Sequence, residues 1–409
     1  MSDAPTATAP RQLGFREFVA LMAMLFSTIA FAIDAMLPAL PRIGAELAPD
    51  NLSAVQLVVT VFVLGMGLGT LVCGPLSDAL GRKSVMVWGL SLFAIGALAA
   101  ARAETIEGLL TARFIQGLGA AAPRVVALAM VRDLYHGRAM ARVMSIVMTL
   151  FIFVPAVAPS IGAAIIWAFD WRAIFTAFVI FGLVSGLWLG LRQPETLAPE
   201  ARRPLRLALL AAALAEILGN PAVRLYTLVL ACAFGSMFTW LSGASLIFAE
   251  VYDREASFPL WFAALALVAG ASNIVNARLV MRLGMRRIAI TAIATQAALA
   301  LPVAGLVALG LPAPWDFAVL IFFLAVVFFS FGLTLGNLNA LAMQPLGHMA
   351  GIGAAVIGFL QTVLAVGIAV PVSLAYDGTP LPAVLGTAGC AAAALGFMIW
   401  AGKHDHGPG

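Results

Sequence analysis

Long apolar runs dominate this chain of 409 residues and constrain its fold more than any other feature. Each run has about the 20 residues that an α-helix needs to cross the hydrocarbon core of a bilayer. The runs are continuous and lack the alternation of β-barrel strands, and only helices and closed barrels satisfy their backbone in lipid. The predicted spans are residues 18–40, 54–76, 84–101, 108–131, 140–167, 173–191, 222–248, 258–280, 287–309, 316–340, 351–374 and 381–401.

The composition agrees with a membrane protein. Hydrophobic residues make up 63% of the chain and charged residues 10%, whereas a soluble domain carries about a quarter charged residues. The formal net charge of +4 comes from bases scattered over short loops, which gives no indication of a nucleic-acid partner. Cys73, Cys232 and Cys390 lie inside apolar runs without paired spacing, so they predict neither disulfides nor a metal site. We therefore predict an all-α membrane protein with twelve transmembrane helices.

A polar stretch near the middle divides the predicted spans into two groups of six. Residues 192–221 mix proline, charge and an amphipathic segment, as a linker lying along a membrane face would. When the sequence is aligned with itself at an offset of half its length, Gly81 matches Gly284, which indicates a weak internal repeat. The predicted organisation is an N-terminal tail (1–17), a six-helix half (18–191), the linker (192–221), a second six-helix half (222–401) and a C-terminal tail (402–409).

The bases are distributed unevenly over the two sides of this layout. Of the 23 Lys and Arg residues, 17 lie on the side that includes the N-terminus, four lie in the opposite loops and two lie within spans. The positive-inside rule therefore predicts that both termini are cytoplasmic. The first apolar run lacks the basic start and the cleavage site of a secretory signal, so we expect it to remain as a span.

Two motifs carry a recognisable family pattern. The turn after the second span reads GPLSDALGRK (74–83) and matches G-x-L-x-D-x-x-G-R-K in full, and the fourth span contains RFIQGLG (113–119), which matches R-x-x-Q-G-x-G. On these residues the chain resembles the major facilitator superfamily, and more closely its twelve-span drug:proton antiporters of the bicyclomycin- and chloramphenicol-resistance type. The antiporter signature of the fifth span is met only in part, because Pro159 and Gly162 match but Val154, Ala158 and Ala163 replace glycines.

The resemblance implies the major facilitator fold in a bacterial-type inner membrane, with proton-coupled export of small amphipathic compounds by alternating access. It also implies a monomer that uses the proton gradient in place of a cofactor, with a small-molecule substrate, protons and lipid as partners. A polar cluster would latch the cytoplasmic ends of the spans while the carrier faces outwards; ordinary positive-inside topology is the alternative explanation. The residues of this predicted latch are Gly74, Asp78, Gly81, Arg82, Lys83 and Asp133.

Asp34 and Arg113 are ionisable residues inside predicted spans. Counted from the span ends, both lie roughly 8–9 Å below the outer surface. An acid inside a span is unfavourable by about 2.5–3.5 kcal/mol on insertion scales and usually faces a wet cavity or a partner. We predict that Asp34 carries the coupling proton and that Arg113 responds to its charge. A static ion pair, or an interfacial Asp34 capping the break before Pro38, would be the structural alternative.

Arg124 is not part of the family pattern. It follows Arg113 by 11 residues, which places the two side chains on the same face of a helix. One interpretation is contact with an anionic or carbonyl-bearing substrate. The other is a side chain that extends to the inner interface, helped by Pro123 and backbone carbonyls.

Polar and aromatic residues inside the spans are candidates for the substrate pathway, although each would equally serve helix packing. Pro155 and Pro159, with Gly162, predict a kink in the fifth span. The candidate substrate-binding residues are Phe31, Gln56, Gln116, Arg124, Phe238, Trp240, Asn337, Asn339 and Gln361.

Other functions stay open at this stage. Arg124 and the replaced glycines of span 5 also fit an exporter or importer of a specific metabolite, such as an amino acid or organic acid. A non-transporting membrane sensor or scaffold would use the same fold. The spans hold no His cluster and no nucleophile and base at a catalytic spacing, so we do not expect an enzyme.

Overall fold

Twelve long helices account for most of the residues that the computed structural model describes, namely 13–202, 204–205 and 207–403. Eleven stretches are long and apolar enough to cross a membrane, and one of them, Trp315–Leu374, contains two helices. The predicted twelve-span layout is therefore confirmed. The long helices are α1 (Phe15–Asp34), α3 (Leu57–Leu80), α4 (Arg82–Ala101), α5 (Ile106–Leu134), α6 (Gly137–Ala168), α7 (Arg172–Arg192), α9 (Pro221–Leu246), α10 (Phe258–Leu283), α11 (Met285–Leu309), α12 (Trp315–Met343), α13 (Ala350–Leu374) and α14 (Leu381–Ala401).

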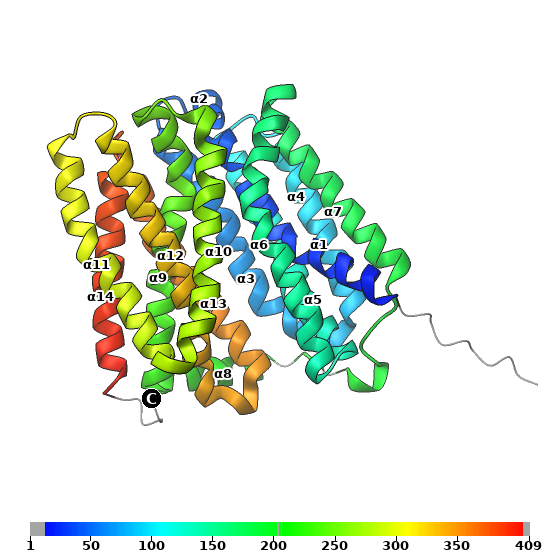
Figure 1. The fold of residues 1–409 in the computed structure, drawn as a ribbon. Helices are drawn as coiled ribbons and strands as arrows, with labels where there is room; N and C mark the ends of the chain where they lie inside the picture. Colours follow the sequence, from blue (N-terminus) through cyan, green and yellow to red (C-terminus); the bar gives the residue numbers. More distant parts are fainter. Residues whose placement is uncertain (1–12, 203, 206, 404–409) are drawn as a thin grey trace, which may run out of the picture.

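The helices form two bundles that stand side by side (Figure 1). In the first half α5 packs against α3 and α4, and α1 packs against α6; in the second half α9 packs against α13 and α14, and α11 against α12. The halves meet mainly where α3 packs against α13 and where α6 packs against α10. Two short helices complete the fold: α2 (Leu40–Leu47) follows α1, and α8 (Leu207–Gly219) lies in the linker.

The linker helix α8 defines one end of the molecule, which we call the linker face (Figure 1). It packs against α9 and α13, where Ala213 and Ile217 are fully buried. The amphipathic linker segment predicted from the sequence is thus a helix docked on the second half. The predicted C-terminal tail lies mostly outside the described residues, as do residues 1–12 of the N-terminal tail.

Glycine brings α3 and α5 into close contact. A Cβ atom on Gly117 would collide with the Phe62 carbonyl oxygen, and one on Gly65 would collide with the Phe114 carbonyl oxygen. Small residues allow helix backbones to approach in this way inside a membrane, where packing drives association because lipid is as apolar as the helices themselves. The outer surfaces carry large apolar side chains such as Trp88 and Leu191, as a lipid-facing surface requires.

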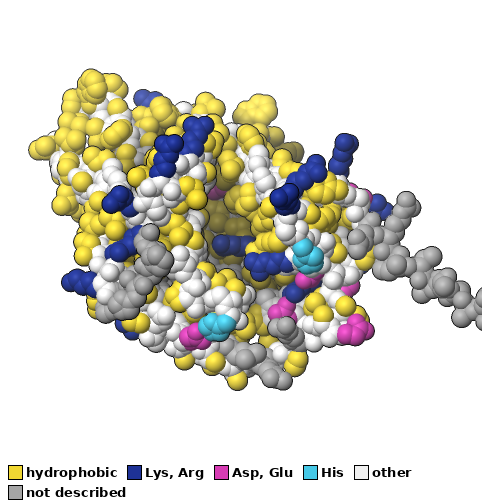
Figure 2. All heavy atoms as spheres, turned by 60° about the horizontal axis from the view of Figure 1, so that its bottom comes forward, with side chains coloured by type: hydrophobic (Ala, Val, Ile, Leu, Met, Phe, Trp, Pro, Cys, Tyr) yellow, Lys and Arg dark blue, Asp and Glu magenta, His cyan; other side chains and the backbone are white. Residues whose placement is uncertain are grey.

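The two halves are closed at one end and separated at the other. One buried apolar cluster includes residues of both halves at the end opposite the linker face, among them Ile43, Phe62, Phe248 and Phe258. Towards the linker face the fully buried apolar residues form two separate clusters, one in each half, and Leu71 of α3 packs against the cluster of the second half. Viewed from the linker side, the molecule is hollowed between the halves, with Lys and Arg side chains in and around the opening (Figure 2). We call this space, between α1–α7 and α9–α14, the central hollow.

The replacement Gly117→Ala is expected to destabilise the protein by about 1–3 kcal/mol, because the added methyl group forces α3 and α5 apart. Thermal unfolding of the purified protein in detergent measures the effect. Gly305→Ala in α11 is the matched control, since its Cβ would meet nothing within 4 Å. Equal unfolding temperatures for the two variants would contradict the packing argument.

Candidate functional site

Asp34 is the last residue of α1 and lies inside the first half. Only 5% of its surface is exposed, and its carboxylate makes no hydrogen bond or ion pair with any described residue. Next to it, α6 approaches so closely that a Cβ on Gly162 would collide with the Ala35 carbonyl oxygen. Gly162 of the partly matched span-5 signature therefore holds α6 against the end of α1. An unpartnered buried carboxyl group is unfavourable in the ionised form and indicates a functional role.

Arg113 on α5 is fully buried and has all its partners inside the first half. Its Nε donates to the Val58 carbonyl oxygen of α3 at 3.2 Å, its Nη1 to Gln116 Oε1 at 2.7 Å, and its Nη2 to the Ala32 carbonyl oxygen of α1 at 3.3 Å. The guanidinium carbon also lies 4.2 Å from the centre of the Phe62 ring, within reach of a cation–π interaction. Arg113 therefore contacts α1 two residues before Asp34.

The direct ion pair between Asp34 and Arg113 that their shared depth suggested is not formed in the described residues. A buried guanidinium needs acceptors for its N–H groups, and neutral acceptors can serve as well as a carboxylate. Two main-chain carbonyls and Gln116 already do so. The Gln116 Nε2 atom is buried without a partner, so Gln116 acts here through its oxygen towards Arg113.

Arg124 has a different environment from Arg113, although both are on α5. Its side chain is exposed, whereas Ala120, Ala121 and Ala127 around it are buried. Its guanidinium makes no hydrogen bond or ion pair within the part of the chain that the structure describes.

Of the predicted latch residues, Asp78, Arg82 and Asp133 meet at the linker face of the first half, whereas Gly74 lies further back along α3, next to Val125 of α5. Arg82, at the start of α4, donates from Nε to Asp133 Oδ2 at 3.1 Å and from Nη1 to Ser77 Oγ at 2.7 Å, and it also pairs with Asp78. The turn is shorter than the sequence pattern suggested, because α3 continues through Pro75 to Leu80. Gly81 alone makes the turn, with φ of +99°, a conformation that favours glycine.

Glu195 in the linker completes this cluster and was not found from the sequence. Its carboxylate accepts hydrogen bonds from the backbone N–H groups of Arg82 at 2.9 Å and Lys83 at 3.1 Å. It therefore caps the N-terminus of α4, where free N–H groups and the helix dipole favour a negative charge. The next residue, Thr196, donates to Asp133 Oδ2 at 3.0 Å. Lys83 joins the cluster through its backbone, since no described residue pairs with its side chain.

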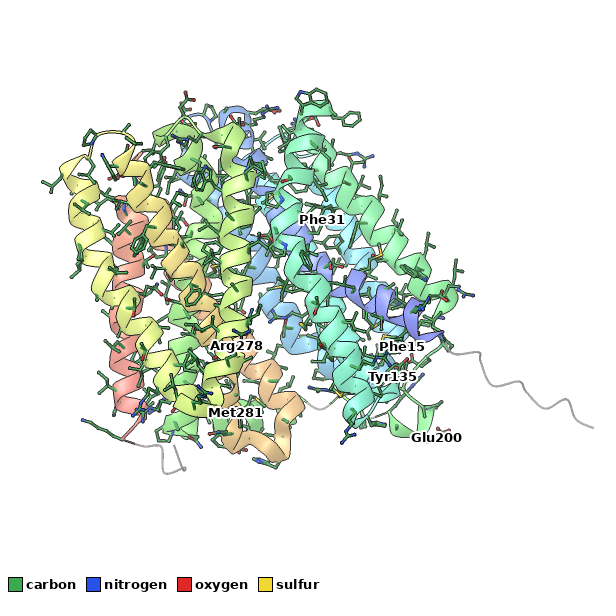
Figure 3. The ribbon with its side chains drawn as sticks, viewed as in Figure 1. Phe15, Phe31, Tyr135, Glu200, Arg278 and Met281 are labelled. Carbon is green, nitrogen blue, oxygen red and sulfur yellow. The ribbon has the colours of Figure 1, made fainter. Side chains whose placement is uncertain are left out.

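The predicted aromatic candidates serve packing within each half. The Phe31 ring meets the Phe178 ring of α7 edge-on, with their centres 5.3 Å apart, and lies tilted against the Phe181 ring at 5.1 Å. Figure 3 places Phe31 among the helices of the first half. Trp240 is fully buried in the second half and donates to Thr387 Oγ1 at 2.9 Å. Phe238, also buried, packs against Phe234 on its own helix.

The polar candidates differ in what surrounds their side chains. Asn337 is bound within the second half, donating to Asn276 Oδ1 at 2.7 Å, and Asn339 donates to the backbone of its own helix. Gln56 lies where the halves meet, because a Cβ on Gly243 of α9 would be 3.1 Å from Gln56 Oε1. Gln361 on α13 has a buried Oε1 atom without a partner. Interior polar atoms without partners therefore occur in both halves, at Gln116 and Gln361.

The fifth span, α6, is a single continuous helix through both predicted kink residues, Pro155 and Pro159. The two prolines remove backbone N–H donors without ending the helix, which is tolerated in membrane helices. Pro159 and Gly162 are buried, on the side where α6 meets α1.

We expect Glu195→Gln to lower the stability of the purified protein by about 1 kcal/mol, because the amide lacks the charge that complements the N-terminus of α4. Thermal unfolding in detergent measures the change. Glu200→Gln serves as the control, since Glu200 is exposed in the same linker and lies at the edge of the molecule (Figure 3). A Glu195 variant as stable as the Glu200 variant would show that the cap contributes nothing.

Comparison with known proteins agrees with this architecture. The chain is 29% identical over 355 residues to the uncharacterized MFS-type transporter YdgK of Bacillus subtilis, covering 84% of this chain and 85% of that protein. It is 28% identical over 282 residues to the bicyclomycin resistance protein homolog of Haemophilus influenzae, covering 68% and 70%. It is 35% identical over 174 residues to the multidrug resistance protein MdtL of Escherichia coli, covering 41% and 44%.

Solved structures share the fold at low sequence identity. The xylose transporter XylE of E. coli, in a partially occluded inward open conformation, aligns with a TM-score of 0.73 at 13% identity, over 94% of this chain and 97% of that one. The POT family transporter PepTSo aligns with a TM-score of 0.74 at 13% identity, over 96% of this chain and 98% of that one. The family model of the Major Facilitator Superfamily matches residues 19–370. This multi-pass membrane protein therefore belongs to the Major Facilitator Superfamily.

Proposed function

We propose that this protein is a proton-coupled exporter of small amphipathic compounds that works by alternating access between its two six-helix halves. Relatives named for bicyclomycin and multidrug resistance support export. The excess of Lys and Arg supports a cytoplasmic linker face with both termini on that side, in a bacterial-type inner membrane. In this proposal the protein acts as a monomer, and the proton gradient supplies the energy without a bound cofactor.

The observation that carries the proposal is the buried, unpartnered carboxyl group of Asp34, two residues after the Ala32 carbonyl that binds Arg113. A protonated Asp34 is compatible with the arrangement seen, because a neutral carboxyl group does not require a cation nearby. An ionised Asp34 would compete for the Arg113 guanidinium, which is held by neutral acceptors. Loss of the proton would then shift Arg113 and the end of α1. Asp34 thus acts as the proton carrier and Arg113 as the group that responds to its charge.

The packing around Asp34 offers a route from this proton to the interface between the halves. Ala35 lies against Gly162 of α6, and α6 also packs against α10 of the second half. Pro155 and Pro159 on α6 leave carbonyls without their usual helical donors, which makes this helix easier to bend. A movement of the α1 end is therefore transmitted to a helix that contacts both halves.

The ends of the molecule supply contacts that alternate during transport. At the face opposite the linker, Arg42 Nε of the first half lies 3.8 Å from Glu255 Oε1 of the second. At the linker face the halves are apart, and the Arg82 cluster is confined to the first half and the linker. We propose that this cluster engages the second half when the linker face closes, which would stabilise the outward-facing state.

Two other functions follow from the same fold. Arg124 favours a transporter of a specific anionic metabolite, as an exporter or importer. A membrane sensor or scaffold would not move substrate at all. Flux assays in proteoliposomes with antibiotics, amino acids and organic acids separate these functions, since a sensor gives no flux with any compound and an importer gives the opposite direction.

For Asp34→Asn we expect substrate-driven proton flux in proteoliposomes to fall to the level of protein-free liposomes, because the amide cannot carry the proton. The protein should still fold, since Asp34 has no partner to lose. Asp50→Asn, an exposed acid of a loop, is the matched control and should keep its flux. An unchanged response of the Asp34 variant to a pH gradient would remove this residue as proton carrier.

For Arg82→Ala we expect slower transport and a population shifted towards the state with an open central hollow, because Asp78 and Asp133 lose their common partner. Spin labels at the exposed positions Ala139 and Ala350, one in each half, would report the change by distance measurement. Arg138→Ala, an exposed arginine at the start of α6, is the control. Wild-type cycling and distances in the Arg82 variant would refute the latch.

A further inference from the structure

The most unusual side chain that the proton mechanism leaves unused is Arg124. It lies ten residues before Leu134, the last residue of α5, or about 15 Å from the helix end. Arginine at such a depth almost always faces a bundle interior or a water-filled cavity, and marks a ligand or ion pathway.

The packing of α5 identifies the space that Arg124 faces. Its neighbour Ala121 contacts Gly69 of α3, and Ala122 contacts Gly89 of α4, so these directions are filled by protein. Arg124 shares its helix face with Arg113, which reaches α3 at Val58 and α1 at Ala32. Towards the linker face that side of α5 borders the central hollow, where Figure 2 shows basic side chains. Because Arg124 is exposed and lies on the helix face that Arg113 directs towards α1 and α3, we infer that it faces the central hollow and not lipid.

Most acids near the linker face are engaged elsewhere. Asp78 and Asp133 bind Arg82, Glu17 binds Arg192, and Glu216 binds His348. Glu195 caps α4, Glu200 is exposed at the edge of the molecule (Figure 3), and Asp34 is buried within the first half. No described carboxylate therefore neutralises Arg124.

An exposed, unpaired guanidinium in a recessed hollow that holds other basic side chains is suited to one ligand chemistry. Guanidinium groups bind oxyanions through two parallel hydrogen bonds, and a recessed site strengthens the attraction relative to bulk water. We infer that Arg124 anchors the anionic group of the substrate, and that the substrates are amphipathic organic anions bearing a carboxylate. This inference rests on the proposed transport function and names the substrate class for it.

Binding to the purified protein in detergent, without any gradient, tests the inference. The probes are built on three aromatic skeletons. Each skeleton is used in three versions, which bear a carboxylate, a carboxamide or an aminomethyl group. The proteins are the wild type, Arg124→Gln, Arg124→Lys and, as a matched control, Arg282→Gln, which replaces an exposed arginine near the linker face of the second half.

The wild type should bind carboxylates at least about tenfold more tightly than the carboxamides or amines, as a charge-assisted hydrogen bond implies. Arg124→Gln should abolish that preference while leaving carboxamide affinity unchanged, Arg124→Lys should retain part of it, and Arg282→Gln should match the wild type. Unchanged thermal unfolding verifies that each variant is folded. A wild type that binds no carboxylate or prefers amines, or an Arg124→Gln protein with full carboxylate affinity, would overturn the inference.

This assay is independent of proton coupling. If Asp34→Asn transports normally but Arg124→Gln loses anion preference, the proton mechanism is wrong and the anion site stands. If Asp34→Asn loses coupling but Arg124→Gln binds carboxylates as the wild type does, only the substrate assignment fails.

Discussion

A polar group inside a bilayer must find its partner within the protein, and the rest of this structure depends on that constraint. The backbone meets it by forming helices, and the helices then associate through close contacts such as Gly117 against Phe62. Arg113 meets it by taking two backbone carbonyls and one amide oxygen as acceptors. The first half is therefore held together around a buried cation by neutral groups.

Among the described residues, the ionisable groups of Asp34 and Arg124 lie within helices of the first half without a partner, and both are placed where function would need them. Asp34 is buried without a partner at the end of α1, and Arg124 is unpaired but exposed to the central hollow. The difference in exposure suggests different roles. A buried acid can exchange a proton when its surroundings change, whereas an exposed arginine is accessible to a ligand.

The linker takes part in the architecture of the carrier and does more than join its halves. Glu195 and Thr196 bind the Arg82 cluster of the first half, whereas α8 packs on the second half and Glu216 pairs with His348 there at 3.1 Å. The linker is thus attached to both halves at the face where they are apart.

The sequence alone determined the number of helices, because twenty-residue apolar runs have no other stable form in lipid, and its two motifs indicated the family. The family pattern also predicted the meeting of Asp78, Arg82 and Asp133. Only the tertiary structure decided the partners of Arg113, the cap by Glu195 and the exposure of Arg124. These depend on which atoms of distant helices lie within 3 to 4 Å, and neither hydropathy nor spacing along one helix contains that information.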